Sequence, residues 1–305
     1  RASMAAVFAS HLERGVSRRA FESLLGQRRS AAAANFIAAP RLLVSRTMKS
    51  SATASASSAQ TWAGNQSQEE FMQKDMCILV NEADEITGHA SKKDCHVFNA
   101  KQPRGLLHRA FSVFLFNERE ELLLQQRAST KITFPSVWTN TCCSHPLYGY
   151  EPSEVEQLAD TAKGLTPGTV NAAVRKLEHE LGIAPALVPR ETFKFLTRLH
   201  YCASMAPAGE GADWSWGEHE MDYILLIKVA GGGEHLGVVP NAEEVDAVKW
   251  VDRGQLKQMM REDSGLQWSP WFRIIEKEFL GRWWDDLDKA LTSEAYVDGK
   301  IHTIL

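Results

Sequence analysis

The sequence predicts an α/β or α+β fold in which helices pack on a mixed β-sheet. Several short apolar segments bounded by turn-forming residues have the composition of buried strands, and one longer segment has the apolar repeat of a helix. The strand-like segments lie on both sides of that helix, and further helices follow near the end of the chain. This order of elements is typical of a layered sandwich.

Six segments carry the strand pattern. They are 76–80, 106–116, 121–127, 193–202, 221–229 and 245–251. Only four residues, Asn-Glu-Arg-Glu, join the second segment to the third, so these two are expected to form a β-hairpin. Residues 209–217 contain two tryptophans between glycines and are predicted to form a loop.

The clearest helix is predicted over 169–181. Its apolar residues recur at the spacing of a single helical face, and Gly182 follows as a helix stop. That face carries Val170, Ala173, Val174, Leu177 and Leu181. Two further helices are predicted over 253–260 and 270–284, the second with a proline in its first turn.

Residues 1–66 differ in composition from the rest of the chain. Alanine, serine and arginine dominate, and only Glu13 and Glu22 are acidic in the first 60 residues. This composition is typical of an organelle transit peptide, with an ordinary disordered tail as the alternative. The Ser/Ala tract at 50–59 favours the chloroplast, with the mitochondrion or the cytoplasm as alternatives. The folded domain is therefore expected to span 67–305.

Composition narrows the class of partner. The net charge of −4 gives no indication of a nucleic-acid partner. No apolar run approaches the roughly 20 residues of a membrane-spanning helix. The five cysteines form no paired pattern, which indicates free thiols in a reducing compartment. A small-molecule ligand and a monomer are expected, although no residue pattern fixes the oligomeric state.

The segment 140–146, Asn-Thr-Cys-Cys-Ser-His-Pro, concentrates reactive groups. Cys143, Ser144 and His145 supply a thiol, a hydroxyl and an imidazole in three consecutive residues. The segment ends a short apolar stretch and precedes a loop, so a rigid scaffold can present these groups to a pocket. A structural zinc site or a buried pair of thiols is an equally acceptable interpretation.

Two acidic residues start the strand near 221. Glu218 and Glu220 alternate along it and share one face, whereas His219 points to the other. Adjacent carboxylates repel each other unless a cation or a shared proton relieves them, so they indicate a metal site; solvated charges on an exposed edge are the alternative. The imidazoles that can complete such a site are those of His96, His108 and His145. This mixed nitrogen and oxygen set suits Zn, Mn, Fe or Mg better than a thiolate-rich structural zinc site does.

Four separated motifs recur in a single order along the chain. They are Gly-Leu-Leu-His-Arg-Ala-Phe-Ser (105–112), Thr-Asn-Thr-Cys-Cys-Ser-His-Pro (139–146), Trp-Gly-Glu-His-Glu-Met-Asp-Tyr (216–223) and Ser-Pro-Trp-Phe (269–272). Together they resemble the type I isopentenyl-diphosphate isomerases from about residue 74 onward. The resemblance implies the Nudix fold, an α/β/α sandwich with a mixed sheet. The leader resembles that of a plant or algal member.

The resemblance implies an enzyme of isoprenoid biosynthesis that interconverts isopentenyl diphosphate and dimethylallyl diphosphate. The implied catalytic residues are Cys143, acting as a thiolate, Glu220, Tyr201 and Trp271. The positions implied to bind the diphosphate are Lys92, Arg127, Lys131 and Ser144. One divalent metal (Zn²⁺, Mn²⁺ or Mg²⁺) would be bound by His96, His108, His145, Glu218 and Glu220. Glu180 would help to bind a second ion, a Mg²⁺ carried by the diphosphate.

The helix near 180 matches the Nudix box, which ends Arg-Glu-U-x-Glu-Glu-x-Gly-U with U a bulky aliphatic residue, only in part. The matching residues are Arg175, Leu177, Glu180, Gly182 and Ile183. Lys176 and His179 stand where glutamates are expected, and Lys176 can instead pair with Glu180 four residues later. A hydrolase with a glutamate-bound Mg²⁺ cluster is therefore disfavoured. The alternatives to an isomerase are a Nudix pyrophosphohydrolase and a metal-stabilised binding domain without catalysis.

Overall fold

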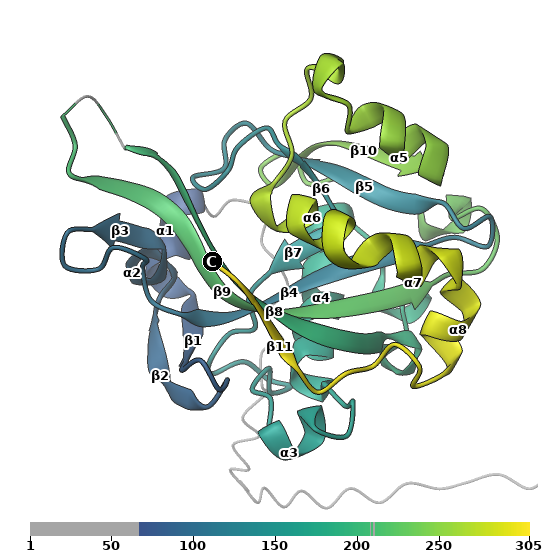
Figure 1. Cartoon of the computed structure of the whole chain (residues 1–305), viewed down its shortest axis with the longest axis horizontal. Helices are drawn as coiled ribbons and strands as arrows, with labels where there is room; N and C mark the ends of the chain where they lie inside the picture. Colours follow the sequence, from purple (N-terminus) through teal and green to yellow (C-terminus); the bar gives the residue numbers. More distant parts are fainter. Residues whose placement is uncertain (1–66, 208, 210) are drawn as a thin grey trace, which may run out of the picture. The chain divides into compact units, whose positions relative to one another are not determined.

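One mixed β-sheet with helices on both of its faces organises the described part of the chain (Figure 1). The structure is a computed structural model, and it describes residues 67–207, 209 and 211–305. This arrangement confirms the predicted α/β/α sandwich. The predicted leader, residues 1–66, lies outside the described residues.

The strands are β1 (Met76–Val80), β2 (Ile86–Ser91), β3 (Val97–Asn99), β4 (His108–Phe116), β5 (Leu122–Arg127), β6 (Trp138–Thr139), β7 (Cys142–Ser144), β8 (Lys194–Pro207), β9 (Trp214–Lys228), β10 (Val245–Val251) and β11 (Ile301–Ile304). The α-helices are α1 (Gln68–Lys74), α2 (Lys92–His96), α3 (Leu158–Thr161), α4 (Pro167–Leu181), α5 (Arg253–Met259), α6 (Pro270–Ile275), α7 (Gly281–Asp285) and α8 (Leu287–Thr292). The strand order along the sheet is β10-β5-β4-β9-β8-β11.

The centre of the sheet is the parallel pair β4 and β9. Every residue of β4 is buried, as expected for a strand that is covered on both faces. The register of the pair sets His108 beside Glu220. β8 lies antiparallel on the other side of β9 and sets Tyr201 beside the same Glu220. The sheet thus brings three chemically active side chains to one point.

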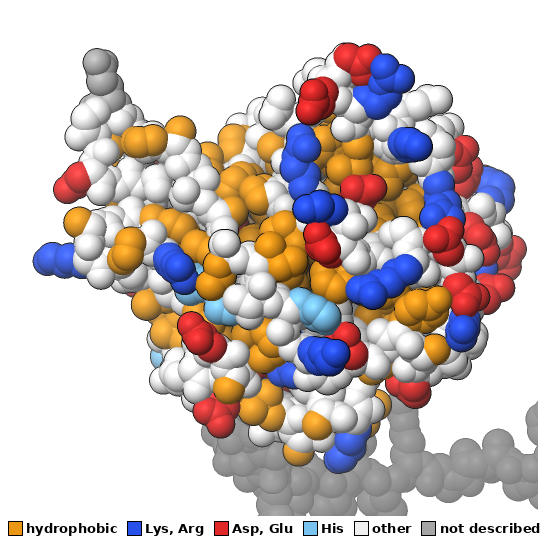
Figure 2. Space-filling view, in the orientation of Figure 1, with side chains coloured by type: hydrophobic (Ala, Val, Ile, Leu, Met, Phe, Trp, Pro, Cys, Tyr) orange, Lys and Arg blue, Asp and Glu red, His pale blue; other side chains and the backbone are white. Residues whose placement is uncertain are grey.

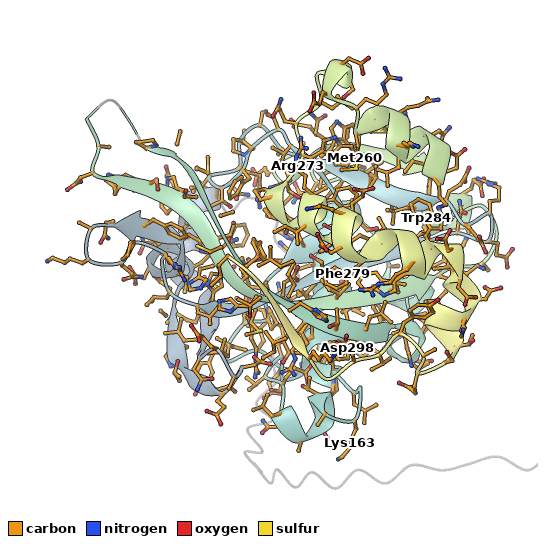
Figure 3. All side chains as sticks on the ribbon, viewed as in Figure 1. Lys163, Met260, Arg273, Phe279, Trp284 and Asp298 are labelled. Carbon is orange, nitrogen blue, oxygen red and sulfur yellow. The ribbon has the colours of Figure 1, made fainter. Side chains whose placement is uncertain are left out.

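Alternate residues of β4 enter two separate hydrophobic cores. Val113 and Leu115 pack in the core under α4, which also buries the predicted apolar face of that helix. Phe114 and Phe116 pack in the core on the opposite face, under α6 and α7. Phe279, labelled in Figure 3, comes from this second helical layer and is buried in that core.

The six predicted strands and the three predicted helices are all present, with two differences in detail. The predicted helix 270–284 is built from α6, a π-helical turn (Glu276–Leu280) and α7. The loop predicted over 209–217 is wrong at its end, because β9 already begins at Trp214. β8 and β9 run past the sheet as an antiparallel ribbon, and β3 adds Val97 opposite Trp216.

Figure 2 shows how charged side chains are distributed over one face of the molecule. On the side shown in Figure 2, basic and acidic side chains are interspersed over the region of α5 to α8. This side therefore offers no extended basic patch of the kind that attracts nucleic acid. Within the part of the chain that the structure describes, no helix combines the length and apolar character needed to cross a membrane.

Candidate active site

Three imidazoles and two carboxylates meet where β4, β7 and β9 come together. His108 begins β4 and lies beside Glu220 of β9, His145 directly follows β7, and His96 ends α2. Glu218 shares the face of Glu220, as the strand period predicted. The five ligand atoms all lie within 4.8 Å of one another and all five residues are buried. We call these five residues the imidazole cluster.

Hydrogen bonds outside the imidazole cluster orient two of its rings. The Nδ1 atoms of His96 and His108 lie 2.6 Å from the carbonyl oxygen of Lys92 and 2.7 Å from that of Leu106. A carbonyl only accepts, so each Nδ1 carries the proton and each Nε2 keeps a free lone pair. Carbonyl-bound imidazoles of this kind are common in metal sites.

The inward-facing atoms of the cluster fit a cation. Nε2 of His96 lies 2.7 Å from Oε2 of Glu218. Neither of these atoms, nor Nε2 of His108, has a hydrogen-bond partner among the described residues. Buried polar atoms without hydrogen-bond partners are costly, and a divalent metal bound between them would relieve that cost. The residues present therefore fit the metal that the sequence implied.

Burial sets the protonation of the cluster. It lowers the pKa of His108 to about 3, with the neighbouring His96 adding to the effect, and it lowers the pKa of His145 well below its usual value. Burial also raises the pKa of Glu220 well above its usual value, and Glu218 adds to this. For Glu218 burial acts in the same direction, but the attraction of His96 prevails and the pKa falls to about 2. Neutral imidazoles are the form that binds metals.

Glu220 links the imidazole cluster to a phenol. Its Oε1 lies 2.8 Å from Nε2 of His145, and its Oε2 accepts a short hydrogen bond from the hydroxyl of Tyr201. Burial, together with the charge of Glu220, raises the pKa of Tyr201 well above its usual value. The phenol therefore keeps its proton, and among the described residues its hydroxyl donates to Glu220.

Cys143 faces the same pocket from β7. Burial raises the pKa of its thiol to about 12, although the guanidinium of Arg127 opposes this from 3.8 Å. The family resemblance implies a thiolate, whereas this environment favours the protonated thiol. Cys142, the adjacent residue, is fully buried with its sulfur 3.5 Å from Oε2 of Glu180. Successive strand residues point to opposite faces, so only one of the two thiols lines the pocket.

One pocket of about 360 Å³ collects most of the predicted residues. Its lining residues are Lys92, Arg127, Lys131, Thr133, Cys143, Ser144, His145, Glu180, Tyr201, Glu218, Glu220 and Trp271. All the predicted catalytic and diphosphate-binding residues are among them. The predicted ligands His96 and His108 lie beside the pocket in the imidazole cluster.

Aromatic side chains form the apolar side of the pocket. Trp271, in the first turn of α6, is 3% exposed. Its ring centroid lies 6.3 Å from that of Tyr201 and 5.7 Å from that of Phe134, which meets it edge-on. The guanidinium carbon of Arg127 lies 5.5 Å from the same ring. A ring face that already attracts one cation is suited to stabilise positive charge in a ligand.

Buried ion pairs form the polar side of the pocket. Nζ of Lys176 lies 3.0 Å from Glu180, which confirms the predicted pair, and 3.8 Å from Glu244. Glu244 also forms a short ion pair with Lys131. Burial lowers the pKa of Lys131 to about 8 although Glu244 opposes it. We call Lys131, Lys176, Glu180 and Glu244 the lysine cluster. Glu244 was not predicted, because no motif marks it and only its burial beside two ammonium groups reveals it.

Comparison with known proteins adds independent findings. A family profile described as the NUDIX domain matches residues 106–272. The chain is similar to isopentenyl-diphosphate Delta-isomerase II of Clarkia breweri, with 44% identity over 88% of this chain and 89% of the relative. It is 46% identical to isopentenyl-diphosphate Delta-isomerase II, chloroplastic, of Arabidopsis thaliana over 78% of each chain. Isopentenyl-diphosphate Delta-isomerase I of Camptotheca acuminata is 46% identical over 78% of this chain and 94% of its own.

Proposed function

Because this chain belongs to the isopentenyl-diphosphate delta-isomerases, a family that carries the Nudix domain, we propose that it interconverts isopentenyl diphosphate and dimethylallyl diphosphate in isoprenoid biosynthesis. The observation that carries the proposal is one pocket with two proton-holding groups. These are the thiol of Cys143 and the hydrogen-bonded carboxyl and phenol of Glu220 and Tyr201. Moving a double bond by one position requires one proton to be added and another to be removed.

We assign the two exchanging protons to Glu220 and Cys143. One group gives a proton to the terminal alkene carbon, which leaves a tertiary cation, and the other takes a proton from the neighbouring methylene to form the new double bond. The reaction is reversible, so each group is the acid in one direction and the base in the other. Tyr201 donates to Glu220, and this hydrogen bond favours the ionised form of the carboxyl.

Trp271 protects the cation. Its buried ring offers a negative face to the tertiary centre, and the surrounding aromatic side chains keep out the water that would trap it.

The polar side of the pocket binds the other end of the substrate. Lys92, Arg127, Lys131 and Ser144 provide positive charge and a hydroxyl for the diphosphate oxygens, which orients the five-carbon chain.

The metals belong to two parts of the site. The imidazole cluster would hold one divalent metal, whose charge lowers the cost of keeping Glu220 ionised. Glu180 would contact a Mg²⁺ that arrives with the diphosphate, although its carboxylate is already paired with Lys176. Metal analysis of the purified protein would identify the ion bound there as Zn²⁺, Mn²⁺ or Mg²⁺.

We also propose that residues 1–66 form a chloroplast transit peptide and that the catalytic domain spans 67–305. The arginine- and serine-rich composition supports this. Relatives from Arabidopsis thaliana and Cannabis sativa carry the word chloroplastic in their names. Expression of a fusion of residues 1–66 to a fluorescent protein in plant cells tests whether this segment directs proteins to the chloroplast.

Isomerisation in heavy water tests the activity. The purified chain with isopentenyl diphosphate and a divalent metal is expected to place deuterium in both dimethylallyl diphosphate and recovered substrate, without release of phosphate. Cys143→Ala is expected to lower kcat by about 10³-fold, because a proton-transfer group is typically worth 10² to 10⁴. Cys202→Ala, which removes a half-buried thiol of β8 outside the pocket lining, is the matched control and keeps the activity. Release of phosphate or pyrophosphate without label would establish a pyrophosphohydrolase instead.

A further inference from the structure

Asn140, between β6 and β7, is fully buried and uses the whole hydrogen-bonding capacity of its amide. Its Nδ2 donates to the carbonyl oxygens of Val113 at 3.1 Å and Cys142 at 2.9 Å. Its Oδ1 accepts from Nε1 of Trp271 at 3.2 Å and from the hydroxyl of Thr139 at 2.8 Å. An indole nitrogen only donates and a carbonyl only accepts, so this network fixes which amide atom faces which partner.

The same network reaches the start of α6. The hydroxyl oxygens of Thr139 and Ser269 lie 2.8 Å apart. Thr139 gives its only proton to Asn140, so Ser269 donates to Thr139. Ser269 also caps α6 by accepting from the backbone N–H of Phe272. The helix that carries Trp271 and the strand that carries Cys143 are therefore joined through one buried chain of hydrogen bonds.

The ring of Trp271 has a single directional contact within the described residues. Its neighbours Phe134, Tyr201 and Arg127 touch it through ring faces, edges and a guanidinium, all of which tolerate rotation. The hydrogen bond from Nε1 to Asn140 does not. Stabilisation of a cation by an aromatic ring requires the charge to lie over the ring face within about 6 Å.

We propose that Asn140 is a positioning residue that fixes the indole face of Trp271 relative to the strand of Cys143. Asn140 does not line the pocket, so it acts through these two residues and does not touch the substrate. The inference rests on the proposed isomerisation, in which Cys143 exchanges a proton close to a cation that Trp271 stabilises. One amide thus sets the spacing between the proton-transfer group and the ring.

A double-mutant cycle tests the proposal. Asn140→Ala is expected to lower kcat about 30-fold with KM changed less than about three-fold, because the ring acts on the charged intermediate and not on the bound substrate. Trp271→Phe keeps an aromatic ring but has no N–H to position. In that background Asn140→Ala is expected to lower kcat less than about three-fold, since coupled residues are not additive. Equal losses in both backgrounds would overturn the proposal.

Asn117→Ala is the matched control. Asn117 is also a fully buried asparagine with hydrogen bonds through both amide atoms, but its partners are Glu121 in the β4–β5 turn and Gly232 in the segment after β9. It is expected to lower the unfolding midpoint and to leave the kcat of the folded protein unchanged. Should Asn140→Ala not fold, Thr139→Val removes one donor to the same amide at constant volume. It is expected to lower kcat about five-fold in the natural background and by less than two-fold with Trp271→Phe.

A spectroscopic measurement separates this inference from the proposed function. The indole N–H resonance of Trp271 is identified by its absence in Trp271→Phe. It is expected to shift upfield and to exchange faster with solvent in Asn140→Ala or Thr139→Val, and to stay in place in Asn117→Ala. An unmoved resonance would overturn the inference even in an active isomerase. Inactivity of the natural chain with a shifted resonance would overturn the proposed function and leave the hydrogen-bonded link intact.

Discussion

The imidazole cluster and the lysine cluster each contribute residues to the lining of the same pocket, but their charges are arranged in opposite ways. In the imidazole cluster, Glu218 and Glu220 face imidazole rings, and no ammonium or guanidinium forms an ion pair with either carboxylate among the described residues. In the lysine cluster, Glu180 and Glu244 are neutralised by Lys131 and Lys176. The carboxylates of the lysine cluster are therefore neutralised by ammonium groups of the same cluster, whereas those of the imidazole cluster are not.

Lys176 and Glu180 lie on α4, the helix that matches the Nudix box in part. A hydrolase of this family would use several glutamates of the α4 region to bind Mg²⁺. Here Lys176 occupies one of those positions and its ammonium group neutralises Glu180. The residues that could hold a metal lie instead at the start of β4 and within β9, where the parallel register sets His108 beside Glu220.

Removing one imidazole should give the largest effect. His108→Ala takes away one of five closely spaced donors, and a neutral ring in a fixed orientation is not replaced by water without loss. We expect the purified variant to retain less than about one tenth of the natural metal content, and kcat to fall by about 10²- to 10³-fold. Elemental analysis of the dialysed protein and the heavy-water assay measure the two quantities.

His200→Ala is the control for that variant. His200 lies on β8 with its Nε2 3.0 Å from Nε2 of His219, outside the imidazole cluster. Its removal should leave both metal content and kcat close to natural values. If His108→Ala bound metal as well as the natural protein does, the imidazole cluster would be a structural group and the comparison between the two clusters would fail.

The relations between site residues that are close along the chain could be predicted from the sequence. Glu218 and Glu220 were placed on one face because a strand alternates with a period of two, and Lys176 was paired with Glu180 because a helix brings residues four apart together. Both relations depend only on nearby residues, and the structure confirms both geometries. The six strands followed from the same kind of local pattern.

The convergence of distant residues could not be worked out from local patterns. His96 reaches the site from a five-residue helix that no periodicity marks. Its partner Glu218 lies far from it along the chain. The positions of Glu244 and Asn140 depend on which strands pair and in which register. The resemblance to a known family supplied the ligand set, but neither of these two residues was among those it implied.

Removing the ammonium of Lys176 should destabilise the fold. Lys176→Met keeps the length of the side chain and leaves Glu180 and Glu244 buried without their shared partner. Breaking a buried ion pair in this way costs about 3–5 kcal/mol. Urea unfolding measures the loss, and added Mg²⁺ should recover part of it by taking the place of the ammonium. Glu178→Ala, an exposed change on the same helix, should stay within about 0.5 kcal/mol of the natural chain.

An unchanged free energy of unfolding in Lys176→Met would contradict the charge arrangement of the lysine cluster. A loss of stability that Mg²⁺ does not reduce would support the ion pairs. It would contradict the idea that the ammonium group occupies the place of a metal ion. Both outcomes bear on the comparison, because it holds that one cluster already contains its cation.

The two adjacent thiols offer the smallest and most selective test, since β7 assigns one to each side of the sheet. Cys142 is buried in the core under α4 with its sulfur near Glu180, whereas Cys143 faces the pocket near Arg127. Cys142→Ala should therefore cost about 1 kcal/mol of stability, through a small cavity and one weak hydrogen bond, with kcat within about two-fold. Urea unfolding and the heavy-water assay, run beside Cys143→Ala, measure both. A loss of kcat above ten-fold in Cys142→Ala would mean that the strand presents the other thiol, and the assignment of Cys143 would fail.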